Sequence, residues 1–285
     1  MLKKIMIISA LILLGIFFLS RSINRPYYYV DSFNQLSFPE DRGKIKFESS
    51  ILETNQNYSL EKIVYESQSE KIYAHLYVPV SNKPASALIY IPAAGATKEG
   101  LGNVAKEIAS NGYAVLLIDM RGLGETKGVN IPLEQESEAY QKGEIPQSFM
   151  YIYDALKAFD LLYNDKRIDK DKIIFTGESL GARTSITAAA MEKRSKGAIV
   201  FSTAGFNSQH PFVMIVDPDN YVSKISPRRL VMFHSLDDKV VPFDAANNTF
   251  SKAKEPKEMI IMPKPCDHGW CFQIEKRFFE ELAKF

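Results

Sequence analysis

The sequence predicts an α/β fold in which helices cover both faces of a mostly parallel central sheet with an antiparallel N-terminal edge. From residue 87 onward, short apolar runs alternate with segments of helical period, which is typical of parallel strands buried on both faces. Before them lie two β-rich runs, Lys62–Glu66 and Lys71–Val78, separated by the turn-like Ser67–Glu70. Such a pair predicts an antiparallel hairpin that opens the sheet.

The composition is that of a globular protein with a sizeable core. Of the 285 residues, 46% are hydrophobic and 24% are charged. The formal net charge of +1 gives no basic surface for nucleic acid, so we expect no nucleic-acid partner.

Residues 1–22 are predicted to be a signal-anchor or a signal peptide. Lys3 and Lys4 precede an apolar run from Ile5 to Leu19 that only Ser9 interrupts. Fifteen helical residues span about 22 Å, less than the hydrocarbon core of about 30 Å, so the length lies between a signal-peptide core and a full span. We favour an uncleaved membrane anchor, with a cleaved signal as the alternative. Either segment places the rest of the chain outside the cytoplasm.

Residues 23–58 are polar and mixed, which predicts a linker or N-terminal extension with one strand near Lys44–Phe47. The α/β domain is expected over residues 59–285. After the hairpin, its predicted strands are Ala87–Ile91, Ala114–Ile118, Ile173–Thr176, Ala198–Ser202, Leu230–His234 and Glu258–Met262. Its predicted helices are Asn103–Asn111, Gln147–Tyr163, Ala182–Ala190, Phe243–Lys252 and Phe272–Lys284.

A serine stands at the junction between the strand and helix in the middle of this domain, in the run Gly177-Glu178-Ser179-Leu180-Gly181. A sharp strand-to-helix reversal brings backbone segments too close for side chains, which explains a glycine two positions away on each side. The turn holds the hydroxyl clear of the backbone, beside the helix N-terminus. Ser179 is therefore the candidate nucleophile.

A serine hydroxyl needs a general base, and the base needs an acid that orients it. Among the four histidines, His75 lies within a predicted strand and His210 in an irregular loop. His234 ends a strand, where it would fix the following turn by hydrogen bonds. His268 follows the last predicted strand beside Gly269, so it is the candidate base.

The orienting acid is expected on the strand between the nucleophile and the base, where Asp237 and Asp238 are adjacent. Only one of the two can meet the histidine, because adjacent loop residues point in different directions.

Stabilisation of the oxyanion calls for two backbone donors. The N–H of Leu180, directly after the serine, is the first. The second is expected in the loop after Ala87–Ile91, with Ala94 as the first choice and Ala93 as the next.

From about Leu60 to the C-terminus, the chain resembles an α/β-hydrolase-fold serine hydrolase of the dienelactone-hydrolase-like and prolyl-oligopeptidase-like esterase group. The motifs that carry the resemblance are G-E-S-L-G at 177–181, D-M-R-G-L-G at 119–124 and the run at 234–242. The last run resembles the H-G-x-x-D-x-x-V-P of that family, and this resemblance places the catalytic aspartate on Asp238.

Two residues depart from the family's pattern. Ser235 stands where the family has glycine, and Pro92-Ala93 stands where the oxyanion loop usually has H-G. The second departure leaves the geometry of the second oxyanion donor open. Arg121, in the D-M-R-G-L-G run, is usually a structural residue in this family.

Many members of this family carry a large lid, but the lengths of two connections in this chain predict a small cap. The connection Thr203–Arg229 is short and contains three prolines, and the insertion Glu125–Pro146 is polar. Phe206, Phe212 and Tyr221 would either form the wall of a pocket or pack this connection.

The only two cysteines, Cys266 and Cys271, flank the loop that contains His268. Two thiols and one histidine are too few for a closed zinc site, and we expect no metal. In an exported chain, a small disulfide is one hypothesis and two free thiols are the other.

We therefore expect a serine hydrolase that cleaves a small-molecule carboxylic ester through an acyl-enzyme, with Ser179, Asp238 and His268 as its triad and no cofactor. A peptidase or an acyltransferase could use the same triad. Leu180, in place of the tyrosine common in prolyl-oligopeptidase-like peptidases, and the lack of a propeller domain favour an esterase. A non-catalytic binding protein at the membrane is the rival from another class, but no triad member is missing.

Overall fold

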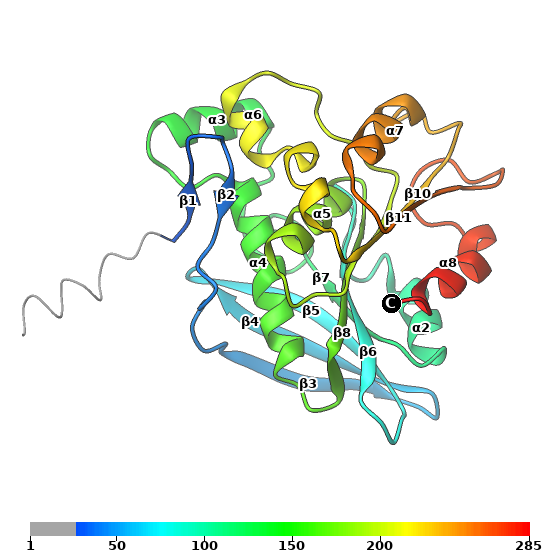
Figure 1. Cartoon of the computed structure of the whole chain (residues 1–285). Helices are drawn as coiled ribbons and strands as arrows, with labels where there is room; N and C mark the ends of the chain where they lie inside the picture. The colour runs from blue at the N-terminus through cyan, green and yellow to red at the C-terminus, as the bar shows by residue number, and fades with distance from the viewer. Residues whose placement is uncertain (1–26) are drawn as a thin grey trace, which may run out of the picture. The chain divides into compact units, whose positions relative to one another are not determined.

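The computed structural model describes residues 27–285, so the predicted anchor or signal segment lies outside the described residues (Figure 1). The chain divides into two compact units. The first ends at Asp41, and the second runs from Arg42 to Phe285. In the first unit, β1 (Tyr29–Val30) and β2 (Leu36–Ser37) form a short antiparallel pair. None of the helices within residues 27–285 has the length and apolar character that a membrane span requires.

The second unit is built on a nine-stranded sheet with the strand order β11-β10-β9-β8-β6-β7-β5-β4-β3. Strands β6 to β11 run parallel to one another, and β5, β4 and β3 add an antiparallel edge next to β7. The strands are β3 (Phe47–Thr54), β4 (Tyr58–Ser67), β5 (Glu70–Pro79), β6 (Ala85–Ile91), β7 (Ala114–Ile118), β8 (Ile168–Glu178), β9 (Gly197–Phe201), β10 (Arg229–His234) and β11 (Lys257–Ile261). The predicted sheet is thus confirmed.

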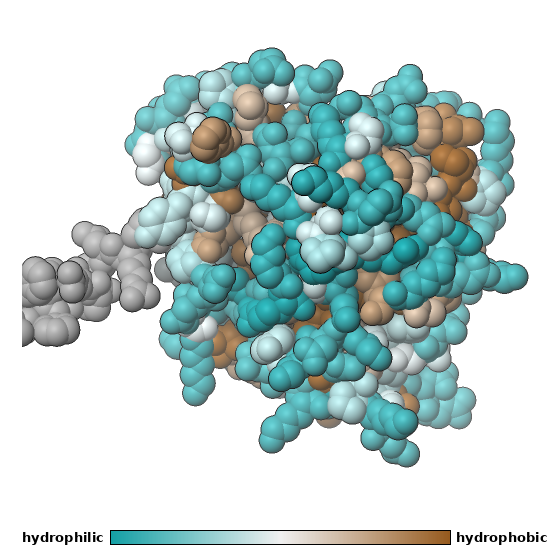
Figure 2. Space-filling view, in the orientation of Figure 1, coloured by the Kyte–Doolittle hydropathy of each residue, from teal (hydrophilic) through white to brown (hydrophobic). Residues whose placement is uncertain are grey.

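Helices cover both faces of this sheet, α4 and α5 on one and α2 and α8 on the other (Figure 1). The helices are α2 (Gly102–Ser110), α3 (Leu133–Gln141), α4 (Gln147–Tyr163), α5 (Leu180–Met191), α6 (Pro211–Val216), α7 (Phe243–Lys252) and α8 (Glu275–Leu282). Every residue of β7 and β9 is buried, as their unbroken apolar sequences predict. Hydrophilic side chains dominate the face of this unit that Figure 2 shows.

Three elements differ from the sequence predictions. The strand expected near Lys44–Phe47 begins at Phe47 and runs to Thr54, so the sheet starts within the segment expected to be a linker. This strand lies at the sheet edge and is almost entirely exposed, and hence its sequence lacks a buried pattern. The polar insertion Glu125–Pro146, for which no helix was predicted, contains α3, and the connection Thr203–Arg229 contains α6.

Helices α3 and α6 contact each other and form the small cap (Figure 1). Three aromatic rings join this cap to α4. The ring centroid of Tyr140 lies 5.8 Å from that of Phe149 and 5.5 Å from that of Phe212. Short helices with a weak apolar period are stabilised here by tertiary packing, which a periodicity argument does not detect.

Candidate active site

Ser179 occupies the sharp turn between β8 and α5, with backbone angles φ 51° and ψ −113°. A non-glycine residue with positive φ is strained, and such strain is found at the nucleophile of strand–turn–helix elbows. A Cβ on Gly177 would lie 2.6 Å from the carbonyl oxygen of Ile91, and one on Gly181 would lie 2.1 Å from the same atom. Only glycine fits at either position.

Asp238 and His268 form a hydrogen-bonded pair, with 2.8 Å between His268 Nδ1 and Asp238 Oδ2. The other carboxylate oxygen of Asp238 accepts the backbone N–H groups of Val240 at 2.9 Å and Val241 at 2.8 Å. Burial raises the pKa of Asp238, but the hydrogen bonds from Val241, His268 and Val240 outweigh it and hold the pKa below its usual value. Asp238 is therefore an ionised acceptor for the imidazole.

Asp237 points elsewhere. Its side chain is half exposed and pairs with Lys264 at 2.9 Å. Of the two adjacent aspartates, the structure brings only Asp238 to His268.

His234 closes the turn that carries Asp238. Its Nε2 donates to the carbonyl oxygen of Val241 at 2.8 Å, and the side chain is fully buried. Burial lowers the pKa of His234, although the bond to Val241 and the charge of Asp238 partly offset this. This histidine takes the turn-fixing position that the sequence predicted.

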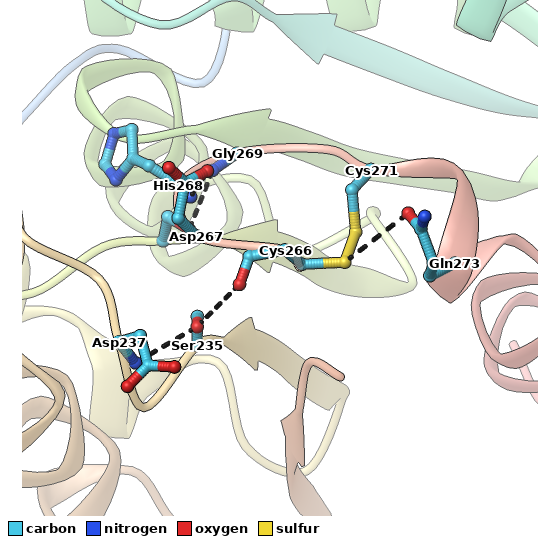
Figure 3. Close-up of a disulfide and its surroundings, with 9 residues drawn as sticks. Ser235, Asp237, Cys266, Asp267, His268, Gly269, Cys271 and Gln273 are labelled. Carbon is cyan, nitrogen blue, oxygen red and sulfur yellow. Dashed lines mark hydrogen bonds between the residues drawn. A yellow bond between two sulfur atoms is a disulfide. The ribbon is translucent and has the colours of Figure 1, made fainter. Parts of the chain in front are cut away.

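The loop that carries His268 is attached at three points. Cys266 and Cys271 form a disulfide across it, with 5.8 Å between their Cα atoms. Ser235 Oγ donates to the carbonyl oxygen of Cys266 at 2.8 Å, and Figure 3 shows this bond beside the disulfide. Ser202 Oγ accepts the N–H of Gly269 at 2.9 Å. In Figure 3, the imidazole of His268 lies on the opposite side of the loop from the disulfide.

Glu178 joins this loop to the elbow. The hydroxyl of Tyr90 donates to its carboxylate at 2.5 Å, and the backbone of Trp270 also hydrogen-bonds to it. A Cβ on Gly269 would lie 2.6 Å from Glu178 Oε2, so the residue after His268 packs against the residue before Ser179. Burial raises the pKa of Glu178, although the hydrogen bonds and His268 partly offset this.

Sequence reasoning did not assign a role to Ser202, Ser235 or Glu178. Each contacts a residue far away in the chain, so no local pattern shows the contact. The one signal available for Glu178 was a carboxylate inside the elbow motif itself.

The loop expected to supply the second oxyanion donor lies against the start of α5. A Cβ on Gly181 would be 2.3 Å from the carbonyl oxygen of Pro92, so this loop and the elbow touch. The N–H of Ala96 closes a turn in this loop by donating to the carbonyl oxygen of Ala93 at 3.0 Å. Among residues 27–285, the N–H groups of Leu180 and Ala94 make no hydrogen bond, and Ala94 is exposed.

Two buried ion pairs hold the loops around the elbow. Lys98 is fully buried, and its ammonium lies 2.7 Å from Asp119, which ties the loop after β6 to the loop after β7. Arg121 makes a bidentate pair with Asp154 at 2.7 and 2.8 Å. The interactions of Arg121 with α4 fit the structural role that the resemblance implied.

A cavity of about 190 Å³ opens beside the elbow, between α4, α5 and the cap. Its wall includes Leu180, Arg183, Phe206, Glu136, Tyr151 and Val216. Of the three aromatic residues expected at a pocket, Phe206 lines this cavity. Phe212 is buried within the cap, and Tyr221 is buried in the segment after α6, where its hydroxyl donates to the carbonyl oxygen of Ile215. Within residues 27–285, no group of three or more metal-ligating side chains could hold a metal ion.

The sequence model of the family described as "Serine aminopeptidase, S33" matches residues 82–229, just over half of the chain. The matched segment contains the elbow but ends before Asp238 and His268. The chain is also 22% identical over 163 residues to the protein YfhR of Escherichia coli O157:H7, a match that covers 53% of this chain and 52% of YfhR. The chain thus spans about half the length of the curated relatives it matches.

Solved structures share the architecture. An acetyl xylan esterase from Paenibacillus sp. R4 superposes with a TM-score of 0.73 at 16% identity, over 86% of this chain and 90% of that one. Acetyl xylan esterase 1 from Thermoanaerobacterium sp. JW/SL YS485 gives 0.65 at 16% identity, over 85% and 87%. At these identities, the likeness shows the α/β-hydrolase fold.

Proposed function

The chain belongs to the serine aminopeptidase S33 family and has the α/β-hydrolase fold, and from this we propose that it is a serine hydrolase of carboxylic esters. The observation that carries the proposal is the 2.8 Å bond between His268 and the buried Asp238, on a loop that packs against the elbow of Ser179.

In the proposed reaction, the hydroxyl oxygen of Ser179 attacks the ester carbonyl while Nε2 of His268 takes the hydroxyl proton. Asp238 accepts the hydrogen bond from Nδ1–H, which fixes the tautomer with a free Nε2 and stabilises the imidazolium. His268 then gives the proton to the leaving alkoxide. Water, activated by the same histidine, hydrolyses the acyl-enzyme and restores Ser179.

The developing oxyanion would be bound by the backbone N–H of Leu180 at the start of α5 and by that of Ala94. Both groups lack a partner within residues 27–285, and the close approach of Gly181 to Pro92 brings their two segments together. Preorganised donors of this kind stabilise the transition state more than the ground state. No step requires a metal ion or a cofactor.

Peptide-bond hydrolysis is the second candidate, because the matching family is described as a serine aminopeptidase. The same triad could also serve an acyltransferase. We place the ester first because the cavity next to Leu180 is small and lies under a cap of two short helices, which suits a small-molecule acyl or alcohol group.

We also propose that the protein acts outside the cytoplasm, tethered by residues 1–22 or secreted after their removal. The lysines before the apolar run support this, as does the disulfide across the His268 loop, because disulfides persist in oxidising compartments. Fractionation of cells that express the full chain, with N-terminal sequencing of the product, tests the proposal. Recovery of the intact chain from the cytosolic fraction contradicts it.

Labelling with a fluorophosphonate probe tests the nucleophile. Wild-type protein should be labelled, and Ser179→Ala should not. Rates on p-nitrophenyl esters of increasing acyl length should then be compared with rates on aminoacyl p-nitroanilides. Faster turnover of the anilides would replace the esterase proposal with a peptidase, and equal labelling of Ser179→Ala would remove the triad assignment.

A further inference from the structure

Arg183 lies on the cavity wall one helical turn beyond the elbow serine. Its backbone N–H donates to the carbonyl oxygen of Ser179 at 3.1 Å, and its side chain lines the cavity together with Leu180. Leu180 directly follows the serine, so the wall that carries Arg183 begins at the elbow itself.

The guanidinium is held in place through one edge only. Nε donates to the carbonyl oxygen of Ala204 at 2.8 Å, and the guanidinium carbon lies 4.2 Å from the ring centroid of Phe206. Within residues 27–285, its two terminal nitrogens have no hydrogen-bond or ion-pair partner. A planar fork with two unpaired N–H₂ groups matches the geometry of a carboxylate.

The nearby acids are already engaged elsewhere. Asp217 accepts the backbone N–H groups of Asp219 and Phe206, and Asp219 pairs with Lys252 at 2.5 Å. The cavity also contains Glu136, whose carboxylate accepts two hydrogen bonds from Ser148, at 2.8 and 2.6 Å. None of these acids forms an ion pair with Arg183.

A half-buried cation without a hydrogen-bonded counter-ion costs desolvation free energy. Burial lowers the pKa of Arg183, and the charges of Asp217 and Asp219 offset this only in part. A bound anion would offset the remaining cost.

We propose that Arg183 is a substrate-binding residue for the carboxylate of an anionic ester, with the carboxylate on either the acyl or the alcohol part. This inference rests on the proposed ester hydrolysis at Ser179 and adds the charge class of its substrate. The phenyl ring of Phe206 and the carbonyl of Ala204 orient the guanidinium, and its terminal N–H₂ groups donate hydrogen bonds to the carboxylate.

Two matched substrate pairs test the proposal. On the acyl side, mono-p-nitrophenyl glutarate is compared with p-nitrophenyl valerate, which has the same number of acyl carbons. On the alcohol side, 4-acetoxybenzoate is compared with its methyl ester. Wild-type protein, Arg183→Gln, Arg183→Lys and the control Arg167→Gln are measured with all four. Arg167 directly precedes β8, at the end of that strand opposite to Ser179.

Wild-type protein should prefer the charged member of at least one pair. In Arg183→Gln, kcat/KM for that substrate should fall about 10- to 100-fold, mainly through KM, while the neutral partner changes by less than about threefold. Arg183→Lys should recover part of the preference, and Arg167→Gln should retain all of it. The substrate pair for which Arg183→Gln no longer prefers the charged member identifies the side of the ester that carries the carboxylate.

An equal loss on charged and neutral esters in Arg183→Gln would show a purely structural arginine and overturn the proposal. If the wild type reacts with the fluorophosphonate probe but prefers neither charged ester, the hydrolase proposal stands and the anionic subsite falls. If the wild type neither labels nor hydrolyses any of the four esters, both proposals fall.

Discussion

At the scale of single residues, Asp238 and Asp237 differ in environment although they are adjacent. Asp238 is buried and accepts hydrogen bonds from His268 and two backbone N–H groups, whereas Asp237 is half exposed and pairs with Lys264. Asp238→Asn should lower kcat on p-nitrophenyl acetate about 1,000-fold, because an amide favours the wrong imidazole tautomer. Asp237→Asn is the matched control and should change kcat by less than about twofold. A similar loss in both variants would contradict the assignment of the acid.

Tyr90 and Glu178 make a pH-dependent contact. Folding raises the pKa of Glu178. At pH values between the pKa of the unfolded state and that of the native state, the native state therefore binds more protons than the unfolded state. The stability associated with Glu178 therefore falls with rising pH in that window. Tyr90→Phe removes the donor to the carboxylate and should raise the native pKa of Glu178 further.

The Tyr90→Phe variant should thus lose more stability at pH 8 than at pH 5, by about 2 kcal/mol at the higher pH. Thermal unfolding of both proteins at the two pH values measures this as a larger decrease in Tm at pH 8. Tyr221→Phe is the control, because its hydroxyl donates to the backbone carbonyl of Ile215. Its Tm loss should not depend on pH, and an equally pH-independent loss in Tyr90→Phe would refute the prediction.

The sequence nominated Ser179, Asp238 and His268 as the triad, and the structure pairs Asp238 with His268, but the sequence did not show the residues that support their loops. A strand-end position and a motif are local properties. By contrast, Ser235 meets Cys266 and Ser202 meets Gly269 only after the sheet has brought separate loops to the same edge. The choice of Asp238 over Asp237 rested on the family resemblance, since adjacent aspartates cannot be ranked from their own pattern.

At the scale of an element, the loop from Cys266 to Cys271 is closed at both ends by the disulfide. Closing a loop of this length is worth about 2 kcal/mol in the chain-entropy model. The double variant Cys266→Ala/Cys271→Ala should remain folded and lower kcat/KM about 3- to 30-fold, because His268 samples more orientations. Ser235→Ala, which removes the hydrogen bond to the carbonyl of Cys266, should also lower kcat/KM.

Ester hydrolysis and thermal unfolding of these variants measure both effects. Ser251→Ala serves as a control, because this serine is exposed and its hydroxyl donates to the local carbonyl of Asn248 within α7. Unchanged kcat/KM in the double alanine variant would show that the disulfide does not position His268.

Strongly periodic elements were predicted with accurate bounds. Helix α4, helix α7 and strand β7 start and end where the sequence pattern placed them. The elements that were missed are β3, α3 and α6. An exposed edge strand has no buried face, and the cap helices depend on ring contacts such as Tyr140 with Phe212. Neither situation leaves a periodic signal in one sequence.

At the scale of the sheet unit, the strand order determines where the chemistry lies. In a parallel sheet the carboxyl ends of the strands share one edge, so the segments after β8, β10 and β11 meet. Asp238 follows β10 and His268 follows β11, and these two strands are neighbours. This explains why alternation of strands and helices pointed to the segment with Asp237 and Asp238 as the source of the acid, although the choice between these two residues needed the family resemblance.

The beginning of the same unit is fixed by Arg42, whose side chain is 5% exposed. Its guanidinium pairs with Asp160 at 2.7 Å and with Glu192 at 2.5 Å, and thus joins the residues before β3 to α4 and to the end of α5. Arg42→Gln leaves the two carboxylates with the more exposed Arg194, which lies 3.0 Å from Asp160 and 2.7 Å from Glu192. Removal of one partner of a buried pair costs about 3 kcal/mol. We expect Tm to fall by about 6–12 °C.

The matched control is Lys46→Gln. Lys46 and Glu66 form a pair whose side chains are 77% and 56% exposed, so this substitution should change Tm little. Thermal unfolding with ester hydrolysis on the folded variants separates a structural from a catalytic effect. Arg42→Gln should unfold earlier yet keep its kcat below the transition, and an equal Tm for the two variants would contradict the importance of this buried pair.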